Sequence, residues 1–286
     1  MKPGAPSRTA LGAASHRAAH QLLEGGRIFA DPLAVRILGA EGEAALARSA
    51  EGPARRVLRL FIAVRSRYAE DTFAAAFARG VRQLVILGAG LDTYAYRTGL
   101  DDGLRIVEVD HPDTQAWKRQ RLTDAGIAVP AHLSFAPVDF ETTTLRDGLA
   151  AAGFDPAQAA FFIWLGVVPY LTESAVFGTL EFIGGLPGGG QVVFDYANPP
   201  APGEGDAYAS ARAALSARVA AAGEAFQSAF ETAALHARLR ELGLGEIEDL
   251  GPAQIRERYF GSRGTAPRDA GGHVIHAATA SRPAGP

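Results

Sequence analysis

The chain has 286 residues, of which 48% are hydrophobic, and a net charge of −3 from 28 basic and 31 acidic side chains. Its length and composition suit a globular protein with a sizeable core, either one elaborated domain or one domain with a smaller cap. The nearly balanced charge excludes a strong field for nucleic acid or an anionic membrane, and the lack of cysteine excludes disulfides and thiolate metal sites.

The first part of the chain is predicted to form short helices outside any sheet. Residues 1–16 contain no apolar run of signal-peptide length, and no run in the chain approaches the roughly 18 residues needed to span a bilayer, so we expect a cytoplasmic protein without a membrane partner. Residues 1–12 are predicted to be an irregular arm and residues 13–23 a helix. Asp31 followed by Pro32 is typical of an N-cap with proline at the first helical position.

A long amphipathic helix is predicted over residues 53–79. Its apolar positions recur at helical spacing and are Val57, Leu60, Phe61, Val64, Tyr68, Phe73 and Phe77. Arg65 and Arg67 lie two positions apart and therefore point in different directions, so one of them could face a ligand at the following glycine turn. An arginine on a helix is, however, more commonly solvated.

Strands and helices alternate from residue 81 to residue 196 at the spacing of βαβ units. The predicted strands are residues 84–87, 104–109, 133–138, 159–168 and 191–196, and the predicted helices between them are residues 112–125 and 173–183. This alternation predicts a parallel sheet with helices on both faces. Ligands bind beyond the carboxyl ends of such strands, where this chain carries Gly88, Asp110, Asp139, Leu165 and Tyr196.

The remaining residues are predicted to cover and close the sheet. Residues 198–205 are the clearest linker, and the Ala-rich residues 207–240 predict one or two helices, with Phe226 and Phe230 as an apolar pair four residues apart. Residues 245–250 and 272–279 predict two last strands as a hairpin-like pair, separated by a short helix at 254–259.

A glycine turn follows the first predicted strand at Gly88, Ala89 and Gly90. Glycines there let the backbone approach a ligand, and Asp92 or Thr93 can cap a following helix whose free N–H groups face the same crevice. An ordinary βα turn, in which glycine serves geometry alone, is the simpler alternative.

An acidic residue ends the second predicted strand. Asp110 lies about 20 residues beyond Gly88, the spacing at which a carboxylate binds a ribose diol. The dinucleotide fingerprint requires a third glycine where this chain has Thr93. The pattern therefore favours a nucleoside cofactor without phosphates, S-adenosylmethionine, over a nicotinamide dinucleotide. Asp139 and Phe140 follow the third strand and could hold an adenine by one hydrogen bond and one stacking face, although a simple turn explains them equally well.

Four segments, in this order, resemble the leucine carboxyl methyltransferase family, and most closely its bacterial small-molecule branch of S-adenosylmethionine-dependent O-methyltransferases. The segments are VRSRYAED, VRQLVILGAGLDTYAYR, RIVEVDHPDTQAWK and FFIWLGVVPYLT. The resemblance covers roughly residues 13–279. It implies an α/β, Rossmann-like class I methyltransferase fold with a seven-stranded, mostly parallel sheet, N-terminal helices and a helical lid insertion. We accordingly divide the chain into a helical cap (1–80), a cofactor-binding core (81–197), a lid (198–240) and C-terminal strands (241–286).

The resemblance also implies roles for single residues. Arg65 would bind the methionyl carboxylate of the cofactor, and Gly88, Ala89 and Gly90 would line its methionine and ribose. Asp110 would bind the ribose hydroxyls, and Asp139 with Phe140 would bound the adenine. At Leu165 the chain departs from the eukaryotic members, which carry a glutamate there, so a carboxylate contact at the centre of the cofactor is missing. No metal is implied.

The expected reaction is methyl transfer to a carboxylate, or less readily a hydroxyl, of a small natural-product-like molecule of secondary metabolism. A carboxylate is already ionised at neutral pH, whereas a hydroxyl needs a general base. The candidate bases are Tyr196 with Asp195, His111, His273 and His276, and they form no evident catalytic constellation. A non-catalytic cofactor-binding protein and an NAD(P)-dependent oxidoreductase are the alternatives.

Overall fold

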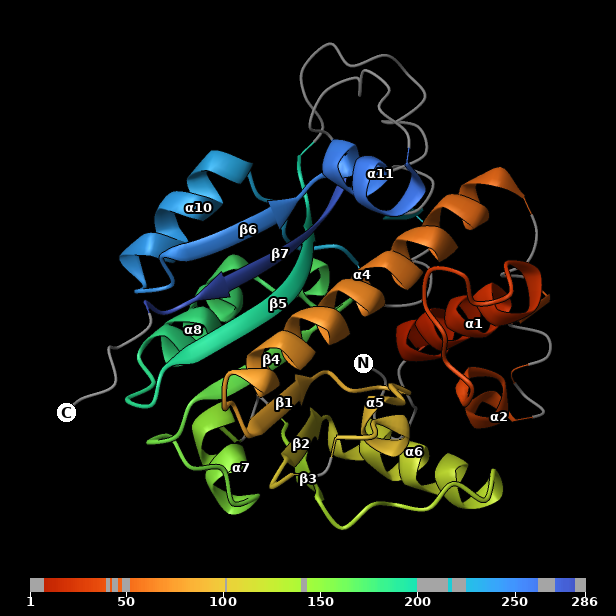
Figure 1. Ribbon diagram of the computed structural model, residues 1–286, viewed down its shortest axis with the longest axis horizontal. Helices are drawn as coiled ribbons and strands as arrows, with labels where there is room; N and C mark the ends of the chain where they lie inside the picture. The colour runs from red at the N-terminus through yellow and green to blue at the C-terminus, as the bar shows by residue number, and fades with distance from the viewer. Residues whose placement is uncertain are drawn as a thin grey trace.

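The computed structural model describes residues 8–39, 42, 46–47, 52–100, 102–139, 143–199, 216–217, 225–261 and 271–280. They contain one seven-stranded sheet with the strand order β3-β2-β1-β4-β5-β7-β6 (Figure 1). The strands are β1 (Gln83–Leu87), β2 (Arg105–Asp110), β3 (Leu133–Pro137), β4 (Ala160–Trp164), β5 (Gly190–Ala197), β6 (Glu246–Leu250) and β7 (Gly272–Ala278).

Helices cover both faces of this sheet. They are α1 (Arg8–Leu23), α2 (Ala34–Leu38), α4 (Pro53–Ala78), α5 (Tyr94–Arg97), α6 (Pro112–Asp124), α7 (Leu145–Ala151), the 3-10 turn η1 (Val168–Tyr170), α8 (Glu173–Gly184), α10 (Thr232–Glu241) and α11 (Pro252–Phe260). Figure 1 shows α4 lying across one face of the sheet, with α1 and α2 to one side. Helices α7, α8 and α10 pack on the opposite face of the sheet. Within the described part of the chain, no helix is long and apolar enough to cross a membrane.

The direction of the strands confirms the predicted, mostly parallel sheet. Strands β1 to β5 pair in parallel, with Leu87 opposite Val109 at the end of β1. Strand β7 runs antiparallel to both β5 and β6, which confirms the hairpin-like closure. The carboxyl ends of β1, β2, β4 and β5 therefore meet at one edge of the sheet, where ligands of such folds bind.

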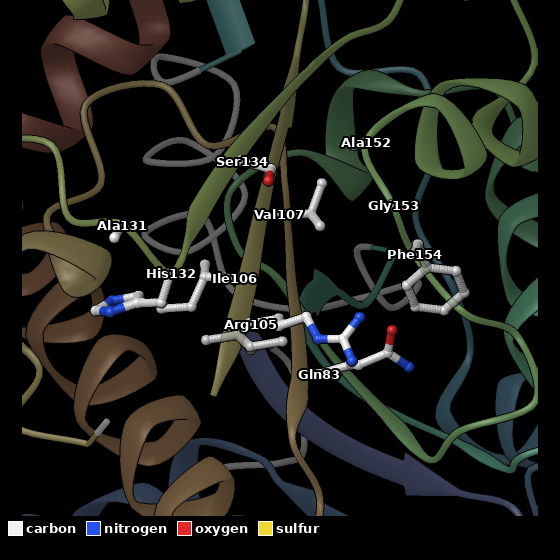
Figure 2. A pocket seen from close by; sticks show the side chains of 11 residues that line it. Gln83, Arg105, Ile106, Val107, Ala131, His132, Ser134, Ala152, Gly153 and Phe154 are labelled. Atoms are coloured by element: carbon white, nitrogen blue, oxygen red, sulfur yellow. The ribbon is translucent and has the colours of Figure 1, made fainter. Parts of the chain in front are cut away.

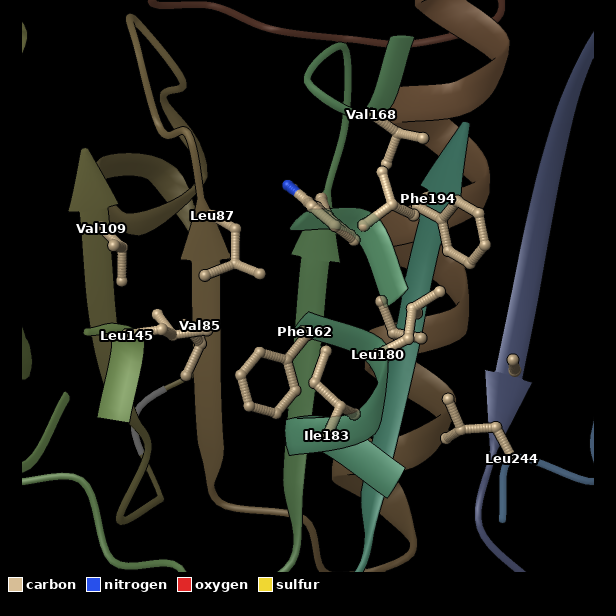
Figure 3. Close-up of a cluster of buried hydrophobic side chains, with 14 of the residues drawn as sticks. Val85, Leu87, Val109, Leu145, Phe162, Val168, Leu180, Ile183, Phe194 and Leu244 are labelled. Atoms are coloured by element: carbon tan, nitrogen blue, oxygen red, sulfur yellow. The ribbon is translucent and has the colours of Figure 1, made fainter. Parts of the chain in front are cut away.

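The core consists of apolar layers on either face of the central strands. Every residue of β1 and of β4 is buried, as expected for strands covered on both faces. Figure 3 shows one layer, in which side chains of β1, β2, β4 and β5 pack against α7 and α8; it includes Val85, Leu87, Val109, Leu145, Phe162, Leu180, Ile183 and Phe194. The long helix α4 packs on the opposite face through residues that include Val64, Tyr68 and Phe73.

The N-terminal elements differ from the prediction at their starts. Helix α1 begins at Arg8 rather than at residue 13, and the additional first turn brings Ala10 against Gly90 of the glycine turn. Residues 1–7 lie outside the described residues. The predicted cap at Asp31 is wrong, since α2 begins at Ala34 with Leu33 as its N-cap residue. Asp31 instead accepts a hydrogen bond from the Leu33 N–H (3.1 Å) within the preceding turn.

Three further differences lie after the first three strands. Strand β4 ends at Trp164 instead of residue 168, because the chain turns at Gly166, whose φ is +72°. Helix α7 is not predicted by the sequence. The helix predicted over residues 207–240 is wrong for residues 225–231, which have no regular secondary structure before α10 starts at Thr232. Most of residues 200–224 lie outside the described residues.

Candidate functional site

The glycine turn after β1 is a position where side chains do not fit. Gly88 has a φ of +63° and Gly90 a φ of +45°. A Cβ atom at Gly88 would lie 2.4 Å from Cγ2 of Val167, and one at Gly90 would lie 2.9 Å from Cβ of Ala10. The turn is tied to the next strand by a hydrogen bond from the Ala89 N–H to the Val109 carbonyl oxygen (3.1 Å). Glycine is therefore required here for close approach as well as for backbone conformation.

Asp110 lies at the carboxyl end of β2 and connects this turn to α6. Its Oδ2 accepts a hydrogen bond from the Gly90 N–H (2.6 Å), and its Oδ1 accepts one from the His111 N–H (2.7 Å). Burial raises the pKa of the Asp110 carboxyl, and these two backbone hydrogen bonds act in the opposite direction. Each carboxylate oxygen retains a further lone pair for a ligand hydroxyl.

A cavity of about 370 Å³ lies against the glycine turn. This volume falls within the roughly 300–1,000 Å³ typical of small-molecule sites. Its walls come from α1, α4, β1, β2, the end of β4 and η1, and the lining residues are Thr9, Ala10, Ala13, Arg17, Ser66, Ile86, Leu87, Gly88, Ala89, Gly90, Leu91, Asp92, Asp110, Thr114, Ile163, Leu165, Gly166, Val167, Tyr170 and Leu171. Of the predicted cofactor-binding residues, the structure thus brings Gly88, Ala89, Gly90, Asp110 and Leu165 together at one cavity.

Arg65 borders the cavity from α4 without lining it. Its Nη1 donates a hydrogen bond to Oδ2 of Asp195 (2.7 Å), and both residues are buried. Oδ1 of Asp195 accepts a hydrogen bond from the N–H of Gly166 (2.6 Å), which does line the cavity. A Cβ atom at Gly166 would lie 2.6 Å from Nη2 of Arg65, so the guanidinium reaches the cavity wall. Arg67 points elsewhere and pairs with Asp71.

Arg17 lines the cavity although no sequence pattern predicted it there. Arg17, Ala10 and Ala13 lie on one face of α1, and all three line the cavity. Nη2 of Arg17 donates to the carbonyl oxygen of Leu91 (2.5 Å), directly after the glycine turn, and Nε of Arg17 lies 3.4 Å from Asp31. The available signal was the spacing of two alanines and an arginine at i, i+3 and i+7, which places them on one helical face.

The predicted adenine-binding pair is described only in part. Asp139 follows β3 at the same edge of the sheet, is half-buried, and does not line the described cavity. Its carbonyl oxygen accepts a hydrogen bond from the Thr143 N–H (2.7 Å). Phe140 lies outside the described residues.

The candidate bases do not converge on the cavity. His111 is the N-cap of α6, where its Nδ1 accepts a hydrogen bond from the Asp113 N–H (3.2 Å). Tyr196 and His273 lie in a buried polar cluster beside β6, and Asp195 is paired with Arg65. His276 lies in the middle of β7, where burial lowers the pKa of its imidazole. None of these five residues lines the described cavity.

A second, smaller cavity of about 110 Å³ lies at the opposite edge of the sheet (Figure 2). It is lined by the starts of β1 and β2 and by neighbouring loops, and Gln83, Arg105, His132 and Phe154 are among its residues. Because this edge holds the amino ends of the parallel strands, it is not the ligand-binding edge expected for the fold.

The fold and the glycine-turn cavity define a class I S-adenosylmethionine-dependent methyltransferase fold. Among solved structures, a protein from Thermobifida fusca that is assigned as a methyltransferase has a TM-score of 0.56 at 14% sequence identity, with 98% of this chain and 97% of that chain covered. The family model described as leucine carboxyl methyltransferase matches residues 10–184. The chain therefore belongs to the leucine carboxyl methyltransferase family.

Two bacterial relatives agree with this assignment. YktD of Bacillus subtilis, named for an inferred S-adenosyl-L-methionine-dependent methyltransferase activity, is 36% identical over 205 residues, covering 70% of this chain and 66% of YktD. FRAAL3718 of Frankia alni, named for the same inferred activity, is 35% identical over 196 residues, covering 66% of this chain and 68% of that protein. The chain thus spans about two thirds of the length of these relatives.

S-adenosylmethionine is the cofactor, and the described residues at this cavity fit it. A cradle without Cβ atoms at Gly88 and Gly90 admits a ligand close to the backbone. Asp110 offers lone pairs to the ribose hydroxyls, and Nε of Arg65 is buried without a hydrogen-bond partner among the described residues. An unpartnered guanidinium N–H on a residue that borders the cavity suits the carboxylate of the methionyl group.

Proposed function

We propose that the protein transfers the methyl group of S-adenosylmethionine to a carboxylate oxygen of a small molecule. Membership of a carboxyl methyltransferase family supports this reaction. A carboxylic acid with a pKa near 4 is ionised at neutral pH, so its oxygen attacks without a general base. The enzyme then has chiefly to align the acceptor with the methyl group and to exclude water.

The charged groups of the cavity wall favour a carboxylate over a hydroxyl as the methyl acceptor. Among the described residues that line the cavity there is no histidine or lysine, while Arg17 places a guanidinium there. Guanidinium groups bind carboxylates by charge-assisted hydrogen bonds. Arg17, which also contacts Asp31, is the one cation among these described lining residues, and Asp92 is the one carboxylate there besides Asp110, the proposed ribose ligand. An acidic acceptor needs no base, so the cavity supports a carboxylate more directly than a hydroxyl.

One wall of the cavity suits an apolar acceptor body. Val167, Tyr170 and Leu171 line it, and the ring of Phe226 packs against that of Tyr170 with centroids 5.3 Å apart. Apolar and aromatic walls with a few placed polar groups are typical of sites for small organic ligands. We therefore infer a small aromatic or aliphatic acid, which agrees with the expectation of a natural-product-like substrate.

In this proposal each site residue has one task. S-adenosylmethionine supplies an electrophilic methyl group on a sulfonium sulfur. Arg65 binds its methionyl carboxylate, Asp110 its ribose hydroxyls, and the glycine turn lets both parts approach the backbone. Leu165 lines the cavity as an apolar residue, and it helps to keep water from the reacting atoms.

The test is a transfer assay with S-adenosylmethionine carrying a tritiated methyl group and a panel of carboxylic acids and phenols. We expect label to enter an acid, and mild alkali to release it as methanol, because a methyl ester hydrolyses in base whereas a methyl ether does not. Asp110→Ala serves as the variant with weakened cofactor binding. Alkali-stable label would identify a hydroxyl acceptor, and binding of the cofactor without transfer to any acceptor would favour a non-catalytic protein.

A further inference from the structure

A buried polar cluster joins α10 to the last three strands of the sheet. Oδ2 of Asp249 accepts a hydrogen bond from the Tyr196 hydroxyl (2.6 Å) and lies 2.8 Å from Nε2 of His236. Oδ1 of Asp249 lies 2.9 Å from Nδ1 of His273. The Tyr196 hydroxyl also lies 3.2 Å from Oγ1 of Thr232, the first residue of α10. These five residues are referred to as the Asp249 cluster.

The Asp249 cluster is well formed although it lies in an apolar setting. Tyr196 is 2% exposed and His273 1% exposed. Burial would raise the pKa of the Asp249 carboxyl, but hydrogen bonds from His273 and Tyr196 outweigh burial and hold this pKa below its ordinary value. Among the described residues, no group of three acidic, histidine or cysteine side chains is arranged to hold a metal ion.

The Asp249 cluster continues into the segment that precedes α10. This segment, residues 225–231, has no regular secondary structure. At its carboxyl end, Nδ2 of Asn198 donates to Oγ1 of Thr232 (3.0 Å) and to the carbonyl oxygen of Phe230 (3.2 Å), and the Phe230 N–H donates to the carbonyl oxygen of Ala197 (3.1 Å). The 225–231 segment is thereby fastened to the end of β5.

The other end of the 225–231 segment is bonded to η1. The backbone N–H of Gln227 donates to the carbonyl oxygen of Pro169 (2.8 Å), and its side chain donates to that of Tyr170 (2.7 Å). The Ser228 hydroxyl donates to the carbonyl oxygen of Val168 (2.8 Å). Every carbonyl of η1 thus accepts a hydrogen bond from this segment, and Tyr170 of η1 lines the cavity.

We propose that the Asp249 cluster is a positioning device for the acceptor side of the cavity. By holding Thr232 and α10 against β5, β6 and β7, it fixes the 225–231 segment, and this segment fixes η1 and the Tyr170 wall. An irregular segment keeps one position only through such bonds, because it has no ladder of its own. The inference rests on the proposed function, because that function assigns the Tyr170 wall to the acceptor. The glycine turn and Asp110 lie on other elements, and Asp195, which holds Arg65, faces the opposite side of β5 from its neighbour Tyr196. We therefore expect cofactor binding not to depend on the Asp249 cluster.

The experiment compares Asp249→Leu and Asp249→Asn with wild type, with Glu246→Gln on the exposed part of β6 as the matched control. In hydrogen exchange, we expect the amides of residues 226–230 in Asp249→Leu to exchange at least tenfold faster, while β1 to β4 keep their protection. S-adenosylhomocysteine affinity, measured by calorimetry, should stay within about twofold of wild type. Asp249→Asn, which keeps hydrogen-bonding atoms, should give a smaller effect, and Glu246→Gln none.

The same variants test the consequence for catalysis. With an acid that wild type methylates, Asp249→Leu should raise the KM for the acceptor at least fivefold and leave the KM for S-adenosylmethionine unchanged. Three results would overturn the proposal. Faster exchange throughout β1 to β4 would show a general loss of stability, and a loss of S-adenosylhomocysteine affinity as large as the rise in the acceptor KM would show an effect on the cofactor. Unchanged exchange in residues 226–230 would show that the Asp249 cluster does not hold this segment. The exchange and calorimetry measurements need no acceptor, so failure of the proposed function alone leaves them decisive.

Discussion

The N–H of Gly90 donates a 2.6 Å hydrogen bond to Oδ2 of Asp110, which joins the glycine turn after β1 to the end of β2. The other carboxylate oxygen accepts the His111 N–H at the start of α6. One side chain therefore holds two backbone segments at the cavity and still has acceptor capacity for a ligand. This arrangement predicts that Asp110 determines both the shape of the site and its affinity for the cofactor.

Asp110→Ala should weaken the binding of S-adenosylhomocysteine by an order of magnitude or more. Hydrogen bonds to a charged group contribute about 1.5–3 kcal/mol each, which corresponds to roughly 10- to 150-fold in affinity. The affinity for 5′-methylthioadenosine should fall as well, since it has the same ribose. Calorimetry measures both, with the exposed Asp124→Ala on α6 as the control. Unchanged affinity in Asp110→Ala would remove this residue from the site.

Arg65→Met should weaken S-adenosylhomocysteine binding and also destabilise the fold. Removing Arg65 leaves the buried Asp195 carboxylate without its partner, at a cost of about 3–5 kcal/mol in the free energy of unfolding. The double variant Arg65→Met with Asp195→Asn should recover most of this stability, because an amide still accepts the Gly166 N–H. Thermal unfolding measures the recovery.

The double variant separates a binding role of Arg65 from a structural one. It should still bind S-adenosylhomocysteine at least tenfold more weakly than wild type, yet bind 5′-methylthioadenosine with nearly normal affinity, because that ligand has no carboxylate. Recovery of both stability and S-adenosylhomocysteine affinity would identify Arg65 as structural only.

Local sequence patterns predicted the sheet well because each central strand is buried on both faces. The apolar run ending at Leu87 and the glycine turn behind it need no tertiary information to be recognised. Other elements depend on contacts that composition does not reveal. The Ala-rich stretch before α10 favours a helix, but the backbone of Gln227 is bonded to η1 instead. Helix α7 is short and contains Gly148, so the cap at Thr144 is the one clear feature in its sequence that indicates a helix.

The sequence predicted those residues of the candidate site that lie at the carboxyl ends of parallel strands or in the turns that follow them. Asp110 and Leu165 were found because they end parallel strands. Arg17 was missed because its place at the cavity depends on how α1 packs over Gly90 through Ala10, a contact between distant parts of the chain. The pairing of Arg65 with Asp195 across 130 residues is likewise a tertiary feature.

Glu24 should make stability depend on pH in the acid range. A hydrogen bond from Arg59 lowers the pKa of the Glu24 carboxyl in the folded state, against the opposing effect of burial. The unfolded chain therefore binds more protons, so this contribution to stability is present above about pH 4.5 and is lost as the pH falls through the lower folded-state pKa. Urea unfolding of wild type and Glu24→Gln between pH 7 and pH 3 measures it.

We expect Glu24→Gln to cost about 1.5–3 kcal/mol at pH 7, since Glu24 accepts two hydrogen bonds from Arg59, of 2.9 and 2.7 Å, in a buried pair. The difference from wild type should shrink towards pH 3. Glu241→Gln, in the exposed pair with Arg238, should change stability by less than about 1 kcal/mol at either pH. A Glu24→Gln deficit that is the same at pH 3 and pH 7 would contradict the assignment.

Gly166→Ala should impair the cofactor site through Arg65. The φ of Gly166 is +72°, and the added Cβ would lie 2.6 Å from Nη2 of Arg65, so the methyl group strains the turn and pushes the guanidinium from the cavity wall. We expect S-adenosylhomocysteine affinity to fall at least tenfold and the melting temperature to drop. Gly245→Ala, where no atom lies within 4 Å of the added Cβ, should change neither. If Gly166→Ala bound S-adenosylhomocysteine normally, the contact of Arg65 with this wall would be irrelevant to the cofactor.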